Sequence, residues 1–194
     1  MQLIQFGIIV LCLVPTIATL LLAYQVMRAG FGMLGKPTIQ PALFYLTKGI
    51  IGLLFGFLLM ASFSNDFFLK IPGLIQNEIP VVQKLMSLIF LLAGNLLLLP
   101  AYYTMSIFTR VGLPESDHVL QTSGVYRISR NPMYTSFFFF FPACFLLIPS
   151  LYLAAFIVFD LAMHHYIIKK EEAYIESTFG QIYLDYKKKT ARYL

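Results

Sequence analysis

Arg130, Asn131, Pro132 and Tyr134 form the stretch of the chain whose residue types point most directly to a binding site. Asn is favoured immediately before a helix and proline suits the first helical position, so a helix is predicted to begin here. The free amide groups and the dipole at a helix start attract an anion. Arg130 can hold a carboxylate or phosphate through two parallel hydrogen bonds, and Tyr134 on the first turn can contact the same ligand. The simpler alternative is an interfacial anchor for lipid head groups.

A second group of ionisable residues lies about 30–40 positions further on. Asp160, His164 and Glu171 are spaced so that they share one face of a helix, and ionisable residues within a membrane span are functional candidates. Glu171 and Glu172 are expected opposite Arg130, although the neighbouring lysines also allow a solvated charge run. Three histidines and no accessible thiol give no spacing for a metal site, so none is predicted.

The composition predicts that the bilayer is the solvent of most of the chain. Of the 194 residues 59% are hydrophobic and only 12% charged, with a net charge of +5. A soluble domain carries about 25% charged residues, so a soluble globular, disordered or coiled-coil protein is excluded. We predict an all-α polytopic membrane protein with one membrane domain, divided into a three-span bundle (1–103) and a second part (104–194), and no nucleic-acid partner.

Five apolar stretches predict five membrane spans. Residues 132–168 would reach about 55 Å as one helix, against a hydrocarbon core of about 30 Å. Pro149 and Ser150 near the midpoint break that run, so it is predicted to form a tight hairpin followed by a helical carboxyl-terminal segment. The predicted spans are 3–27, 42–63, 81–103, 132–148 and 151–168.

The distribution of basic residues predicts the orientation. With five spans, twelve Lys and Arg residues fall on the side of the carboxyl terminus and only Lys70 and Lys84 on the other. Basic residues are enriched in cytoplasmic loops, so we expect the amino terminus outside and the carboxyl terminus and the site in the cytoplasm. The twelve are Arg28, Lys36, Lys48, Arg110, Arg127, Arg130, Lys169, Lys170, Lys187, Lys188, Lys189 and Arg192.

Three further features have structural interpretations. Cys12 and Cys144 lie in apolar runs and are expected to be buried free thiols. Residues 30–35 match the G-x-G-x-x-G pattern of nucleotide sites, but without a preceding strand they are expected to be a connector. Gly52 and Gly56 allow close helix packing, within the bundle or between two copies of the chain.

The pattern SGVYR-ISRNPMY, followed by EE-x6-FG-x2-Y-x2-Y-x5-R, resembles the membrane methyltransferases that include isoprenylcysteine carboxyl methyltransferase and the phospholipid methyltransferases. The resemblance covers residues 118–192. It implies S-adenosylmethionine as methyl donor and a lipid-soluble acceptor from the bilayer, foremost the carboxylate of a prenylated cysteine. Phospholipid amine methylation, an NADPH-dependent membrane reductase and a non-catalytic lipid-binding protein are the alternatives.

The resemblance also implies roles for individual residues. Arg130, Tyr134 and His164 are the expected catalytic residues. The family has His where this chain has Asn131, and it has an arginine near Ile167 and Ile168 that is absent here. His164 or His165 is expected to replace that arginine. The expected cofactor-binding residues are His118, Val119, Leu120, Gln121, Tyr126, Asn131, Pro132, Glu171 and Glu172.

Overall fold

A computed structural model describes residues 2–32, 35–64, 68, 70–72, 78–106 and 120–194. Within these ranges the chain is all-helical, without a β-strand, as the sequence predicts. His118 and Val119 lie outside the described residues. The helices are α1 (Gln2–Arg28), α2 (Pro41–Phe63), α4 (Val81–Met105), the short 3-10 helix η2 (Gly124–Arg127), α5 (Pro132–Leu147), α6 (Leu151–Phe179) and α7 (Gln181–Lys189).

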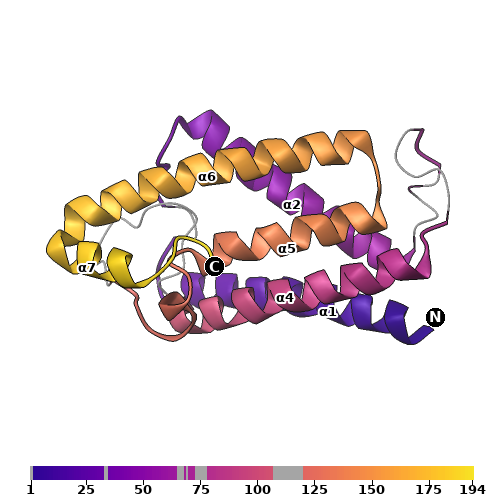
Figure 1. Cartoon of the computed structure of the whole chain (residues 1–194), viewed down its shortest axis with the longest axis horizontal. Coiled ribbons are helices and arrows are strands. Elements are labelled where there is room, and N and C mark those ends of the chain that lie inside the picture. The colour runs from indigo at the N-terminus through magenta and orange to yellow at the C-terminus, as the bar shows by residue number, and fades with distance from the viewer. Residues whose placement is uncertain (1, 33–34, 65–67, 69, 73–77, 107–119) are drawn as a thin grey trace.

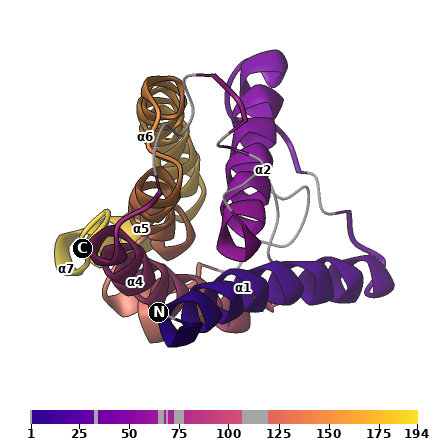
Figure 2. The ribbon, with the colours of Figure 1, turned by 90° about the vertical axis from the view of Figure 1, so that its right-hand side faces the viewer.

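Four of these helices, α1, α2, α4 and α6, are long and apolar enough to cross a membrane. The fifth predicted span is α5, whose 16 residues reach about 24 Å. It lies between α4 and α6 in the middle of the bundle, and the amino terminus lies at the end opposite α7 (Figure 1). In the view along the bundle, α2 and α6 stand on either side, with α1 and α4 below (Figure 2).

The central contact of the bundle is between α4 and α5. Gly94 of α4 has no side chain, and a Cβ placed there would meet the Phe140 ring at 2.9 Å. Phe140 and Phe141 are both almost fully buried. The side-chain amide of Asn95 donates a hydrogen bond of 2.9 Å to the carbonyl oxygen of Leu11, which joins α4 to α1. These contacts fix α5 in the core of the bundle, and this in turn fixes the position of the polar residues at its start.

The hairpin between α5 and α6 forms as predicted, with a break at residues 148–150. The helix α6 continues past Ile168, the end of the predicted span, to Phe179. Residues 169–177 include two Lys, three Glu and one Ala, which favour helix, so the helix continues beyond the apolar span. Gly180 then ends α6 with φ +52°, the left-handed conformation that glycine adopts readily at this position.

Three other sequence features can be placed. Cys12 and Cys144 are buried and free, as predicted. The glycine-rich connector lies between α1 and α2, and no strand precedes it among the described residues. A Cβ at Gly52 or Gly56 would meet nothing within 4 Å. These two glycines therefore lie on the outer surface of α2 and do not support packing within the bundle.

Candidate active site at the α4–α5 loop and the α6–α7 end

The loop before α5 is held against the end of α4. The side-chain amide of Gln121 donates to the carbonyl oxygen of Thr104 at 3.0 Å. Gly124 has φ +58°, and a Cβ on it would lie 2.8 Å from the Thr104 hydroxyl oxygen, so both its conformation and its close approach require glycine. The hydroxyl of Tyr186 in α7 donates to the carbonyl oxygen of Tyr126 at 2.5 Å. The loop is therefore fixed from two sides, by α4 and by α7.

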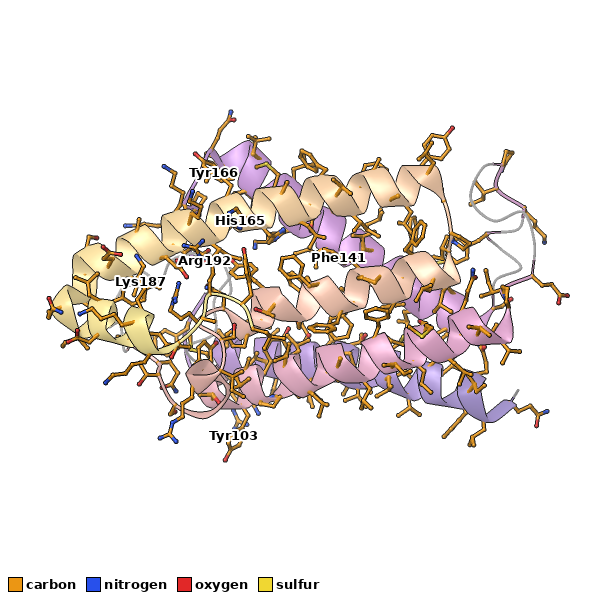
Figure 3. All side chains as sticks on the ribbon, viewed as in Figure 1. Tyr103, Phe141, His165, Tyr166, Lys187 and Arg192 are labelled. Carbon is orange, nitrogen blue, oxygen red and sulfur yellow. The ribbon has the colours of Figure 1, made fainter. Side chains whose placement is uncertain are left out.

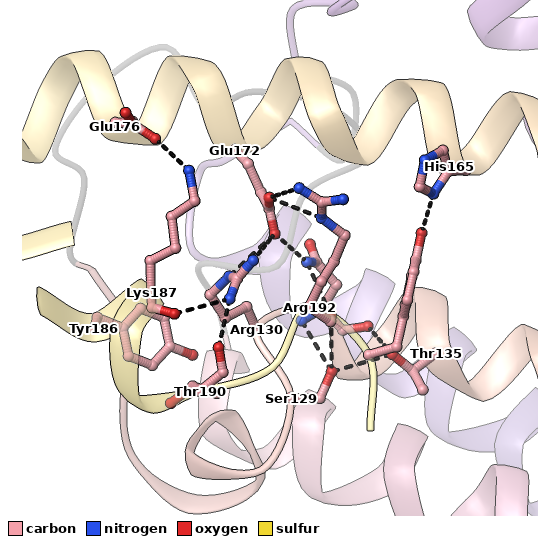
Figure 4. Close-up of polar contacts among 12 residues, drawn as sticks. Ser129, Arg130, Thr135, His165, Glu172, Glu176, Tyr186, Lys187, Thr190 and Arg192 are labelled. Carbon is pink, nitrogen blue, oxygen red and sulfur yellow. Dashed lines mark hydrogen bonds and ion pairs between the residues drawn. The ribbon is translucent and has the colours of Figure 1, made fainter. Parts of the chain in front are cut away.

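The residues immediately before α5 pair with the carboxyl-terminal tail. Ser129 forms an isolated parallel bridge with Ala191, and the backbone N–H of Arg130 donates to the Ala191 carbonyl oxygen at 2.9 Å. The Ser129 hydroxyl is also 3.1 Å from that of Thr135 and 3.3 Å from the Arg192 carbonyl oxygen. Segments about 60 positions apart in the sequence thus form one unit, as Figure 4 shows.

Glu172 is the centre of this unit. Its Oε1 accepts from Nε of Arg130 at 3.1 Å and from the side-chain amide of Asn131 at 3.0 Å. Its Oε2 accepts from Nε of Arg192 at 2.9 Å. Only 5% of the Glu172 side chain and 7% of that of Arg130 are exposed. The predicted juxtaposition of the Glu pair and Arg130 is confirmed, and the carboxylate that Arg130 holds belongs to the protein itself.

The sequence prediction of a helix starting at Pro132 is confirmed, but its capping mechanism is wrong. Asn131 precedes α5 and makes no side-chain capping hydrogen bond. Its amide instead donates to Glu172 and, at 3.3 Å, to the Arg192 carbonyl oxygen. The hydroxyl of Ser129 accepts from the Asn131 backbone N–H at 3.1 Å. Asn131 therefore connects α5 to α6 and the tail, because Glu172 is a stronger acceptor than water or a neutral group.

The environment of this unit keeps its side chains in their usual protonation states. The hydrogen bond to Glu172 raises the pKa of Arg192 above its ordinary value, so that guanidinium stays charged. Burial raises the pKa of Tyr183 and of Tyr186 to about 12. Arg192 and Lys187 approach α6 from the α7 side in Figure 3. The unit is a set of fixed charges and neutral phenols.

A second polar cluster lies further into the bundle, between α2, α5 and α6. The Tyr134 hydroxyl donates to Oε1 of Glu171 at 3.0 Å. Lys48 of α2 donates to the Tyr134 hydroxyl at 3.3 Å, and its Nζ is 3.1 Å from Nε2 of His164. Nδ1 of His164 is 2.8 Å from the carbonyl oxygen of Asp160 and 3.1 Å from its Oδ2. The predicted shared face of Asp160, His164 and Glu171 thus forms one connected site.

The hydrogen-bond partners define the form of His164. A carbonyl oxygen only accepts, so Nδ1 carries the hydrogen; an ammonium group only donates, so Nε2 is the acceptor for Lys48. In this pairing the His164 ring donates through Nδ1 and accepts through Nε2. His165 points elsewhere and its Nδ1 is 2.6 Å from the Tyr193 hydroxyl. Of the two histidines, only His164 reaches the site.

Sequence reasoning did not identify Lys48 as a site residue, although it lies in a predicted span. A charged residue inside an apolar span was the available signal. The two glutamates, predicted together, have different surroundings: both oxygens of Glu172 are bound to the protein, whereas Oε2 of Glu171 has no hydrogen-bond donor among the described residues. Glu171 is therefore the carboxylate that can accept a ligand.

The loop also borders a groove of about 640 Å³ at the end of α4, within the usual size of small-molecule sites. Gln121 is the predicted cofactor residue that lines it; Leu120, Tyr126 and Pro132 lie in the adjacent loop and at the start of α5. The groove is lined by Pro100, Tyr103, Thr104, Ser106, Gln121, Ser123, Gly124 and Val125.

Residues 82–182, just over half of the chain, match the model of the phospholipid methyltransferase family. The matched region runs from α4 to the start of α7 and contains both glutamates and the loop before α5. The chain belongs to this family. Together with the long apolar helices, the family indicates that the protein is a multi-pass membrane methyltransferase. No curated protein sequence gives a significant match.

Proposed function

We propose that the protein transfers a methyl group from S-adenosylmethionine to a lipid-soluble acceptor, foremost the terminal carboxylate of a prenylated cysteine. The family supports methyl transfer. The observation that carries the proposal is the difference between the two glutamates. Glu172 joins α5, α6 and the tail, whereas Glu171 beside it binds Tyr134 through Oε1 and has no hydrogen-bond donor to Oε2 among the described residues.

The residues present fit the proposed donor. S-adenosylmethionine has an ammonium group and ribose hydroxyls that donate hydrogen bonds. Glu171 can accept one through Oε2, which has no donor among the described residues. The fixed loop at Gln121 and Tyr126 supplies backbone groups and an apolar wall. The carboxylate of the donor's methionine part can be held by the amide groups at the start of α5, close to Asn131. When bound, the donor supplies an electrophilic methyl group on a sulfonium.

The protein's part in the reaction is alignment and the exclusion of water. A carboxylate acceptor is already a nucleophile, so its methylation requires no general base. The site must instead hold the acceptor in line with the methyl group in a dry pocket. In the proposal, Tyr134 and His164 border the reacting groups, and Arg130 holds α6 against the start of α5 through Glu172. A lipid acceptor reaches this site from the bilayer.

Methylation of a phospholipid amine is the second candidate. It is favoured by the pairing of His164 with Asp160, whose carboxylate lies 3.1 Å from Nδ1. An amine must lose a proton to become a nucleophile, and a histidine paired with a carboxylate is suited to remove it. The product distinguishes the two candidates, since one is an ester and the other an amine.

We also propose the orientation that the distribution of basic residues predicts, with five spans, the amino terminus outside and the site in the cytoplasm. Single cysteines at the exposed positions Lys70 and Lys188 should react with an impermeant maleimide from opposite sides of sealed vesicles. Reaction from the same side would contradict this topology. Self-association through Gly52 and Gly56 stays a prediction.

Calorimetry on detergent-purified protein tests the donor. S-adenosylhomocysteine should bind and NADPH should not. Glu171→Gln should weaken S-adenosylhomocysteine binding by about 1–3 kcal/mol, and the exposed Lys188→Ala should leave it unchanged. Binding of NADPH alone would refute the proposal, and equal loss in both variants would assign the binding to surface charge.

A further inference from the structure

Lys48 lies outside residues 82–182 that match the family, yet it reaches the centre of the second cluster. It is seven residues from the start of α2, about 10 Å along the helix axis, with apolar residues around it. Its Nζ also lies 5.1 Å from the centre of the Phe44 ring and 4.7 Å from that of Tyr134. A part of the chain that the family does not define thus supplies the cation of the site.

The hydrogen-bond partners of Lys48 are uncharged. An ammonium has three N–H donors, and among the described residues two are used, by the Tyr134 hydroxyl and by Nε2 of His164. The nearest acids are each separated from Lys48 by one intervening side chain. His164 lies between Lys48 and Asp160, and Tyr134 lies between Lys48 and Glu171. No carboxylate within the described ranges forms an ion pair with Lys48. A cation in this setting is well suited to an anionic ligand.

The position of Lys48 relative to Glu171 indicates which ligand it would bind. The Tyr134 hydroxyl accepts from Lys48 and donates to Glu171, so the two charged groups are separated by a single phenol oxygen. If Glu171 contacts the methyl donor, as the proposed function requires, an anion held by Lys48 lies next to that donor, across the Tyr134 hydroxyl from Glu171.

We propose that Lys48 binds the anionic group of the lipid acceptor and thereby selects acidic acceptors over neutral ones. This inference rests on the proposed function. Ile167 and Ile168 of α6 are apolar and buried, and Lys169 and Lys170 after them are exposed, so among the described residues Lys48 is the lysine that reaches this cluster. Tyr134 and His164 orient its ammonium group by accepting two of its hydrogens. The anion is a carboxylate in a prenylated cysteine or a phosphate in a phospholipid.

Competition binding in detergent, with saturating S-adenosylhomocysteine present, tests this inference. N-acetyl-S-farnesylcysteine is compared with its carboxamide, and phosphatidic acid with diacylglycerol. The wild-type protein should bind the acid of one pair roughly ten- to hundredfold more tightly than its neutral partner, the range for a charge-assisted hydrogen bond. The pair that shows the preference identifies the anion as a carboxylate or a phosphate.

Lys48→Met should abolish the preference for the acid, raise KM for the acceptor, and change S-adenosylhomocysteine binding less than twofold. Lys48→Arg should keep most of the preference, and Lys84→Met, at the start of α4, should behave as wild type. Equal binding of acid and neutral ligand by the wild-type protein overturns the proposal even if Lys48→Met fails to fold. A preference that persists in Lys48→Met also overturns it. If the wild-type protein does not bind S-adenosylhomocysteine, that result would instead refute the proposed function.

Discussion

Replacing Glu172 by Gln should damage the fold, whereas the same change at Glu171 should damage only ligand binding. The Glu172 carboxylate holds two guanidinium groups and one amide. Breaking a buried ion pair by removing one partner destabilises by about 3–5 kcal/mol. Arg130 is nearly buried but Arg192 is 31% exposed, and an exposed pair contributes little. We therefore expect Glu172→Gln to lower the free energy of unfolding by about 2–4 kcal/mol.

Thermal melting in detergent measures this difference. For a chain of this size 1 kcal/mol corresponds to about 2–4 °C in Tm, so Glu172→Gln should lower Tm by roughly 5–15 °C. Glu171→Gln keeps an acceptor for the Tyr134 hydroxyl and should melt within about 2 °C of wild type, while S-adenosylhomocysteine binding weakens. The reasoning fails if Glu171→Gln lowers Tm as much as Glu172→Gln does, or if both variants melt like wild type.

Three further predictions concern the same end of the molecule. Asn131→Asp should lower Tm because it places a second carboxylate against Glu172, whereas Asn131→His can still donate to Glu172 and should melt close to wild type; equal melting of the two would contradict the assigned hydrogen bond. Tyr186→Phe removes the donor to the Tyr126 carbonyl oxygen and should weaken S-adenosylhomocysteine binding severalfold, by about 0.5–1.5 kcal/mol; unchanged calorimetry would show that this contact does not fix the loop. The pKa of Tyr183 is about 12 in the folded protein and about 10 unfolded, so stability is full below pH 10 and falls as pH rises from 10 to 12; Tyr183→Phe should lose less Tm between pH 9 and 11.5 than wild type, and equal losses would refute this assignment.

Much of the fold follows from the sequence because apolar length and helix breakers are local signals. The boundaries of α1, α2, α4 and α5 agree with the predicted spans to within about two residues, and Pro149 marks the hairpin. The predicted span 151–168 covers only the apolar part of α6, because hydropathy defines the span and not the end of the helix. Helix propensity after Ile168 favours continuation, and no proline or glycine intervenes before Gly180.

The site was predictable only where its parts adjoin the hairpin. Arg130 precedes the predicted hairpin 132–168 and Glu172 follows it, so their meeting follows from chain geometry. Lys48 comes from a separate span, and which face of α2 meets α5 and α6 depends on side-chain packing that no local pattern encodes. Asn131 was expected to cap α5, but the buried carboxylate of Glu172 competes for its amide. In α7, Ile182 is 69% exposed while Tyr183 beside it is buried, a difference that the packing of this helix against the loop decides.

Transfer of a radiolabelled methyl group tests the central claim most directly. The purified protein in nanodiscs is incubated with S-adenosylmethionine labelled in the methyl group, together with N-acetyl-S-farnesylcysteine and phosphatidylethanolamine. The lipid product is then treated with alkali, which releases the methyl of an ester as methanol and leaves an N-methyl group in place. The proposed function predicts lipid-soluble label that alkali releases and that Glu171→Gln largely removes. Label that resists alkali would contradict the carboxylate acceptor, and the absence of any labelled lipid would contradict methyl transfer to these acceptors.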